Sequence, residues 1–153
     1  MDKGDAPLRT VASSRLVPEL YCRELTRSIW FYVEVLGFEI LYARMEEAFV
    51  YLQREGAELM LEEPRGRVFL AGPLEYPYGR GINLQIEVRD VGELFRAVEH
   101  SRFPIVLPME DRWYRRDDIE LGNRQFVVQD PDGYLLRFFE SLGSRPCLNL
   151  RIR

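Results

Sequence analysis

Histidine and cysteine are scarce in this chain, and their scarcity narrows its chemistry. His100 is the sole histidine, and it falls at the end of a predicted helix, where we expect a surface position. A Ser-His-Asp or Cys-His catalytic set is therefore not predicted. Cys22 and Cys147 lie far apart in the sequence and do not suggest a disulfide framework. We accordingly expect reduced thiols and a cytoplasmic location.

Long apolar runs and an excess of positive charge are also missing. No apolar run approaches the length of a membrane span, and residues 1–15 contain no apolar core of signal-peptide type. The 21 Lys and Arg residues are outnumbered by 25 Asp and Glu residues, which disfavours nucleic-acid binding. We expect a protein that binds neither membranes nor nucleic acids, with a flexible leader at 1–15.

The first half of the chain predicts one helix and four strands. Residues 16–22 predict a strand, Thr26 is a candidate cap for the following helix, and Gly37 ends that helix. Three further strands are predicted at 38–43, 49–53 and 57–62. Residues 63–81 are rich in Gly and Pro and predict a linker.

The second half repeats this order. A strand is predicted at 82–88, and Asp90 can cap a helix over 91–100. The chain is then expected to be extended from Pro104, to form a charged loop or hairpin at 110–120, and to form strands at 125–129 and 134–140. The sequence DPDG at 130–133 predicts a turn, and the chain from Gly143 onward is predicted to be irregular.

The order βαβββ therefore occurs twice, which indicates an internal duplication. The predicted fold is α+β, with mixed sheets in one domain at 16–143. Module one spans 16–62, the linker 63–81 and module two 82–140, followed by a tail at 144–153. With an offset of 66 residues, Leu25 aligns with Val91 and Cys22 with Val88.

Alternation along the predicted strands separates an apolar face from a polar one. The apolar faces carry residues such as Leu16, Leu59, Ile86 and Phe138, and we expect them to pack on the helices. The opposite faces gather Glu19, Tyr21, Glu58, Met60, Glu62, Asn83, Gln85, Glu87, Arg137 and Phe139. Carboxylates that converge in a partly apolar cleft would attract a cation. The alternative is that these are ordinary solvent-facing residues of one-sided sheets.

Three stretches resemble a known family: LYCRELTRSIWFYVEVLGFEI at 20–40, INLQIEVRDV at 82–91 and NRQFVVQDPDGYLLRFFESLG at 123–143. They are similar to bleomycin-resistance proteins of the glyoxalase/bleomycin-resistance family, within the vicinal-oxygen-chelate superfamily. The resemblance implies paired βαβββ modules that curl into a cup. It also implies a homodimer whose clefts lie between subunits, with or without exchange of the N-terminal strand.

The resemblance further implies metal ligands in the first and last strand of each module of the metal-dependent members. Those positions hold Val17, Met60, Asn83 and Arg137 here. Valine cannot coordinate a metal, methionine is a soft ligand, and arginine would repel a cation. We therefore predict no cofactor, no metal site and no catalytic residue. A site built only from Glu19, Glu58 or Glu87 stays open as an alternative.

Aromatic side chains complete the predicted binding site. Trp113 and Tyr114 could stack on planar rings, with Phe126 and Phe139 as apolar wall. The alternative for Trp113 is packing at a dimer interface. The arginines beside it are unfavourable for a cationic ligand, unless they pair with the acidic residues at 117–120.

Three hypotheses for function follow. The first is a bleomycin-type resistance protein that sequesters a cationic aromatic drug by mass action, without chemistry. The second is a metal-dependent lyase, dioxygenase or transferase of the same superfamily, which the missing ligands disfavour. The third is a binding module for an unknown metabolite, since one fold hosts many functions.

Overall fold

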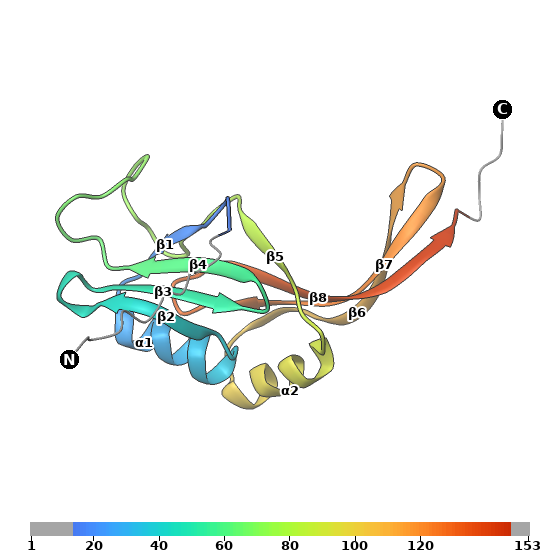
Figure 1. Cartoon of the computed structure of the whole chain (residues 1–153), viewed down its shortest axis with the longest axis horizontal. Helices are drawn as coiled ribbons and strands as arrows, with labels where there is room; N and C mark the ends of the chain where they lie inside the picture. Colours follow the sequence, from blue (N-terminus) through green and yellow to red (C-terminus); the bar gives the residue numbers. More distant parts are fainter. Residues whose placement is uncertain (1–13, 148–153) are drawn as a thin grey trace, which may run out of the picture.

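Two modules of helix and sheet form the protein, as a computed structural model of the chain shows for residues 14–147 (Figure 1). Residues 1–13 of the predicted leader and 148–153 of the predicted tail lie outside the described part. The first module consists of β1 (Glu19–Tyr21), α1 (Leu25–Ile29), η1 (Trp30–Val35), β2 (Glu39–Arg44), η2 (Met45–Glu47), β3 (Phe49–Arg54) and β4 (Ala57–Glu62). The second consists of β5 (Asn83–Glu87), α2 (Val91–Ser101), β6 (Ile105–Arg116), β7 (Ile119–Gln129) and β8 (Leu135–Pro146).

Each module contributes one four-stranded mixed sheet. The strand order is β1-β4-β3-β2 in the first sheet and β5-β8-β7-β6 in the second. In both sheets the first strand of the module runs parallel to its last strand, with Glu19 beside Met60 and Gln85 beside Arg137. The other neighbouring strands are antiparallel. The α+β fold of two βαβββ modules is thereby confirmed, and β1 pairs with β4 of its own chain.

The two helical segments begin in different ways. Asp90 caps α2 by accepting a hydrogen bond from Glu93 N at 2.8 Å, as predicted. Thr26, in contrast, lies inside α1, so its predicted capping role is wrong. The first free N–H of α1, on Leu25, donates instead to Glu63 Oε1 at 2.9 Å, a residue 38 positions away. α1 continues directly into η1, which has π-helical hydrogen bonding.

The helices cover one face of each sheet, and the core lies between them (Figure 1). Leu61 in the first sheet and Phe138 in the second are buried there, as the alternation predicts. The ring of Phe31 in η1 contacts that of Phe103, which follows α2, with centroids 4.3 Å apart, so one core joins both modules. Leu16 does not belong to it: β1 begins only at Glu19, and Leu16 is 82% exposed.

The charged stretch at 110–120 is a hairpin rather than a loop. β6 and β7 pair as far as Arg116 and Ile119, and β8 pairs with β7 as far as Pro146. The prediction of an irregular chain from Gly143 is therefore wrong. Charged side chains suit this ribbon because they pair across strands, as Arg124 and Asp111 do at 2.8 Å. Figure 1 shows the three strands running out beyond the helices.

The DPDG turn fastens the second module to the first helix. Asp130 Oδ1 accepts hydrogen bonds from the backbone N–H groups of Asp132 and Tyr134, and Oδ2 accepts one from the Tyr32 hydroxyl at 2.9 Å. Asp132 accepts hydrogen bonds from Arg23 and from the Ser28 hydroxyl. Both carboxylates are buried, so each depends on these donors in place of water.

Burial raises the pKa of the Asp130 carboxyl to about 6, although three hydrogen bonds to the carboxylate act in the opposite direction. Burial likewise raises the pKa of the neighbouring Cys22 thiol to about 12. Cys22 is therefore a protonated core residue and not a nucleophile. None of the helices within residues 14–147 is long and apolar enough to cross a membrane.

Replacing Tyr32 with Phe should destabilise the protein by about 1.5–3 kcal/mol, because a buried carboxylate loses a hydrogen-bond donor. Urea unfolding followed by circular dichroism measures this change. Tyr76→Phe is the matched control, since Tyr76 is 52% exposed, and it should change the stability by less than about 0.5 kcal/mol. Equal effects of the two substitutions would contradict the role of the Tyr32 hydroxyl.

Replacing Asp130 with Asn tests the pKa of this carboxyl. An unfolded chain ionises Asp near pH 4, whereas the folded protein holds the Asp130 proton to about pH 6. Wild type should therefore lose stability relative to Asp130→Asn as pH rises from about 4 to about 6, by up to about 3 kcal/mol. Urea unfolding of both proteins across this range measures the difference. A difference that does not vary with pH would show that folding leaves this pKa unchanged.

Candidate functional site

Each sheet has a face that the helices leave uncovered, which we call its helix-free face. On the first sheet this face carries four residues of the predicted site: Glu19, Tyr21, Glu58 and Met60. On the second sheet it carries six: Asn83, Gln85, Glu87, Tyr114, Arg137 and Phe139. The predicted binding residues thus form two groups, one on each sheet. Their role in ligand binding remains a prediction.

The helix-free face of the first sheet is aromatic and acidic. The rings of Tyr42 and Tyr51 stack with centroids 5.0 Å apart and an interplanar angle of 21°. The hydroxyl of Tyr51 donates to Glu58 Oε2 at 2.6 Å. Tyr42 is 47% exposed, so part of its ring is open to solvent on this face.

Two carboxyl groups on this face interact directly. A hydrogen bond with Glu19 and, after it, burial raise the pKa of Glu62 to about 7. Arg44, whose guanidinium lies over the ring of Phe49 at 3.8 Å, partly offsets this rise. Below about pH 7, the Glu62 carboxyl therefore keeps its proton. Above this pH the pair gains a negative charge.

The linker covers part of the same face. The backbone N–H of Phe69 donates to the Tyr21 hydroxyl at 2.8 Å, and Tyr21 is only 5% exposed. Ser14 N donates to Glu58 Oε2 at 2.8 Å. The linker therefore covers Tyr21, whereas Glu19 and Tyr42 remain exposed.

The helix-free face of the second sheet carries a chain of polar side chains. Arg137 donates to Gln85 Oε1 at 2.5 Å and to the Tyr114 hydroxyl at 3.4 Å. Gln125 Nε2 donates to that same hydroxyl at 2.7 Å and to Glu110 Oε1 at 2.9 Å. These contacts join all four strands, β5, β8, β7 and β6.

Two predicted site residues lie elsewhere. Phe126 is fully buried in the core, where its ring stacks on Phe138 at 5.7 Å, so it cannot form a wall of the cleft. Trp113 points to the opposite face of its strand from Tyr114, because successive residues of a strand alternate. Its ring covers Gly122 and lies under the Arg145 guanidinium at 4.0 Å. Trp113 and Tyr114 therefore cannot line one binding face together, and packing of Trp113 at a dimer interface stays an alternative.

The positions that correspond to the superfamily's metal ligands do not fit a metal. Arg137 fills one of them with a guanidinium fixed by Gln85 and Tyr114. Met60 lies beside Glu19 in register, and Val17 precedes β1. Within residues 14–147, no three His, Cys, Asp or Glu side chains are grouped so that they could hold a metal ion. No chemical step through a metal is therefore derived for this chain.

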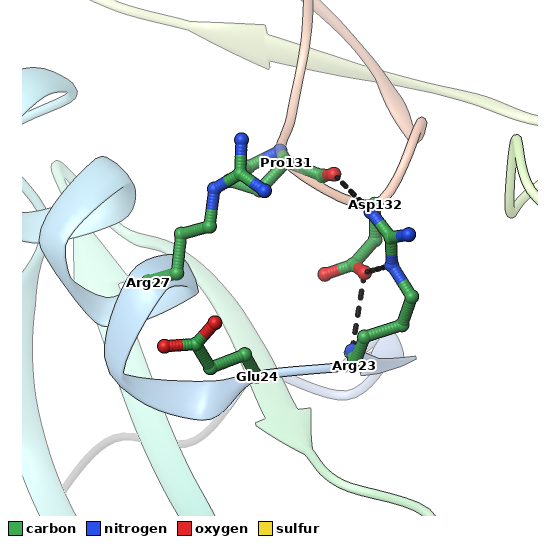
Figure 2. A pocket seen from close by; sticks show the side chains of 5 residues that line it. All are labelled: Arg23, Glu24, Arg27, Pro131 and Asp132. Carbon is green, nitrogen blue, oxygen red and sulfur yellow. Dashed lines mark hydrogen bonds and ion pairs between the residues drawn. The ribbon is translucent and has the colours of Figure 1, made fainter.

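A surface hollow of about 260 Å³ lies at the module junction (Figure 2). Its lining residues are Arg23, Glu24, Arg27, Pro131 and Asp132. Figure 2 shows Arg23 turned onto the Asp132 carboxylate and the carbonyl of Pro131. These groups already serve the junction, and the hollow lies away from both helix-free faces. A second hollow of about 500 Å³ includes Glu87 and Glu140.

Sequence reasoning missed Tyr42, Tyr51, Gln125 and Glu110. The alternation of Phe49, Tyr51 and Gln53 against buried Val50 and Leu52 was a usable signal for Tyr51. Tyr42 follows a bulge between Ile40 and Tyr42, which shifts its face and hides it from a simple alternation. Glu110 lay in the stretch for which both a loop and a hairpin were left open.

Replacing Glu19 with Gln should lower the pKa of Glu62 from about 7 toward its ordinary value of 4.5, because the partner charge disappears. A ¹³C NMR titration of the glutamate carboxyls measures this pKa. Glu58→Gln is the matched control on the same face and should leave the pKa of Glu62 near 7. A value still near 7 in Glu19→Gln would show that burial alone causes the rise.

Comparison with known proteins places the chain in a family. The bleomycin resistance protein of Geobacillus stearothermophilus is 25% identical over 139 residues, which cover 84% of this chain and 97% of that protein. The crystal structure of TioX from Micromonospora sp. ML1 is similar with a TM-score of 0.64 at 24% identity, over 85% of this chain and 100% of that one. A superfamily member from Vibrio splendidus 12B01 is 41% identical over 82% of this chain and 97% of its own, with a TM-score of 0.40.

The sequence profile of the superfamily extends over nearly all of both modules, from residue 14 to residue 138. The resemblance seen in the three sequence stretches is thereby confirmed. The chain belongs to the Glyoxalase/Bleomycin resistance protein/Dioxygenase superfamily.

Proposed function

We propose that the protein binds a cationic, planar small molecule of bleomycin type on the helix-free face of its first sheet and sequesters it without chemistry. The observation that carries this proposal is the Tyr42–Tyr51 stack, in which the Tyr51 hydroxyl donates to Glu58, on a face that also carries Glu19 and Glu62. Resistance to an antibiotic would follow from mass action, since a bound drug is withdrawn from its target. The distant similarity to a bleomycin resistance protein supports the same ligand class.

The physical basis is the combination of ring and charge. The exposed side of Tyr42 gives a planar ligand a surface for stacking, and an aromatic face also attracts cations. Carboxylates beside the rings add a Coulomb attraction that a partly desolvated face strengthens. As Glu62 loses its proton near pH 7, the negative charge of the face increases. Binding of a fixed cation should therefore be stronger at pH 8 than at pH 6.

A homodimer in the cytoplasm belongs to the same proposal. The ribbon of β6, β7 and β8 extends beyond the helices, and among residues 14–147 no strand pairs with the outer edge of β6 (Figure 1). A second subunit that packed on this ribbon would complete a cleft between helix-free faces. Light scattering of the purified protein measures the mass, and a monomer at micromolar concentration would contradict this part of the proposal.

Calorimetric titration with metal-free bleomycin, in the presence of a chelator, tests the ligand. We expect saturable binding at about one drug per subunit, and Tyr42→Leu should weaken it by about three- to tenfold through loss of the aromatic surface. Glu19→Gln should also weaken it at pH 8, above the pKa of Glu62, where the substitution removes one negative charge from the face. Tyr76→Leu removes an equally exposed tyrosine from the linker and should leave the affinity unchanged.

Two results would contradict the proposal. The first is no binding at high micromolar drug, which would leave the acidic face to an unidentified metabolite. The second is an unchanged affinity in Tyr42→Leu, which would place the drug elsewhere on the protein.

A further inference from the structure

The helix-free face of the second sheet holds a partly buried positive charge. Arg137 lies on β8, beside Gln85 on β5 and Val127 on β7. Its guanidinium is held by the amide oxygen of Gln85 and the hydroxyl of Tyr114. Both acceptors are neutral. They fix the position of the guanidinium but do not neutralise its charge.

The other arginines show that this arrangement is unusual. In the described part of the chain, three other arginines are partly buried, Arg44, Arg54 and Arg145, and each forms an ion pair with a carboxylate. The described arginines that lack such a pair are exposed to solvent: Arg15, Arg27, Arg67, Arg96, Arg102, Arg112, Arg115 and Arg116. Arg137 alone among residues 14–147 combines partial burial with the absence of a carboxylate partner. A charge held in this way is unfavourable until an anion arrives.

Several hydrogen-bonding groups around Arg137 remain unused. A guanidinium has five N–H groups, and Gln85 and Tyr114 occupy one on each terminal nitrogen. Nε is buried and has no acceptor among the described residues, and Gln125 Oε1 is likewise buried there without a donor. The oxygen of Tyr114 accepts from both Gln125 and Arg137, so its own hydrogen is free to donate outward. The face therefore presents donors from a guanidinium and a hydroxyl side by side.

Apolar side chains flank Arg137 along β8 and on β7. Leu135 and Phe139 precede and follow Arg137 by two residues on the same face of β8, and Val127 is its neighbour on β7. All three side chains are partly exposed. Such a border disfavours a fully hydrated anion and favours one with an apolar body.

We propose that this face binds the carboxylate of an organic acid with an apolar or aromatic body. Arg137 is the bidentate hydrogen-bond donor to this carboxylate, and Tyr114 is a further donor. The guanidinium matches a carboxylate with two parallel hydrogen bonds, and Leu135, Phe139 and Val127 cover the body of the acid. This site lies on the other sheet from the proposed cation site and does not depend on it.

Sodium benzoate is the probe, titrated into the full chain by calorimetry and followed at the Arg137 Nε–H signal by ¹⁵N NMR. We expect saturable binding that shifts this signal. Arg137→Gln should weaken binding by about tenfold or more, and Tyr114→Phe by about three- to tenfold. Arg137→Lys should bind benzoate about as weakly as Arg137→Gln, because lysine keeps the positive charge but cannot donate two parallel hydrogen bonds to a carboxylate. Inorganic phosphate should bind at least about tenfold more weakly than benzoate, because it lacks an apolar body.

Arg112→Gln is the matched control, since Arg112 is an exposed arginine on the same face of β6 with no described carboxylate partner, and it should bind benzoate as wild type does. Unchanged binding in both Arg137→Gln and Tyr114→Phe would overturn the proposal, as would the absence of saturable benzoate binding. Phosphate binding equal to that of benzoate would overturn the assignment of an organic acid. Tyr114→Phe keeps the test decisive if Arg137→Gln fails to fold.

Discussion

Asp130 and Asp132 lie in one turn between β7 and β8, and the relative placement of the two modules depends on the donors that surround them. The backbone of the turn supplies two N–H groups to Asp130, and the first module supplies the hydroxyls of Tyr32 and Ser28 and the side chain of Arg23. Burying a carboxylate without hydrogen-bond donors costs free energy. The two modules therefore pack stably only in the arrangement that places α1 and η1 next to the turn. The proline and glycine between and after the aspartates give the turn the conformation that brings both carboxylates to the same helix.

This junction leaves one face of each sheet without a covering helix, and the two faces differ in charge. The first combines tyrosine rings with carboxyls, and the second centres on a guanidinium held by neutral groups. Arg137 occupies a position that corresponds to a metal ligand in the metal-dependent members of the superfamily. It therefore places a covalently attached positive charge where those members bind a metal ion. A fixed cation binds and orients an anion, but it cannot open a coordination site for a substrate. On the two proposals made above, the two sheets would bind ligands of opposite charge.

Sequence reasoning succeeded where one local rule was sufficient. It predicted the alternation of β4 and β5, the cap at Asp90 and the turn at DPDG, because each depends on neighbours within a few residues. The duplication was predicted from the repeated order of these local patterns. It was incomplete at the 110–120 ribbon, where it left a charged loop and a hairpin open. Cross-strand pairs such as Arg124 with Asp111 make those charges compatible with a strand, but a pair between strands is not visible in a single segment. It failed for Trp113, whose place over Gly122 depends on the register between β6 and β7.

The sequence by itself determined the family, the two-module α+β fold and the set of polar residues that point away from the core, because hydrophobic alternation decides which face of a strand is buried. Only the tertiary structure decided how those residues are grouped. It divided the predicted cleft between two sheets, buried Phe126 and paired Glu19 with Glu62. It also left Arg137 without a described carboxylate partner. The physical reason is that charge compensation and stacking depend on distances between segments far apart in the chain, and those distances are fixed by sheet register and by the junction at Asp130.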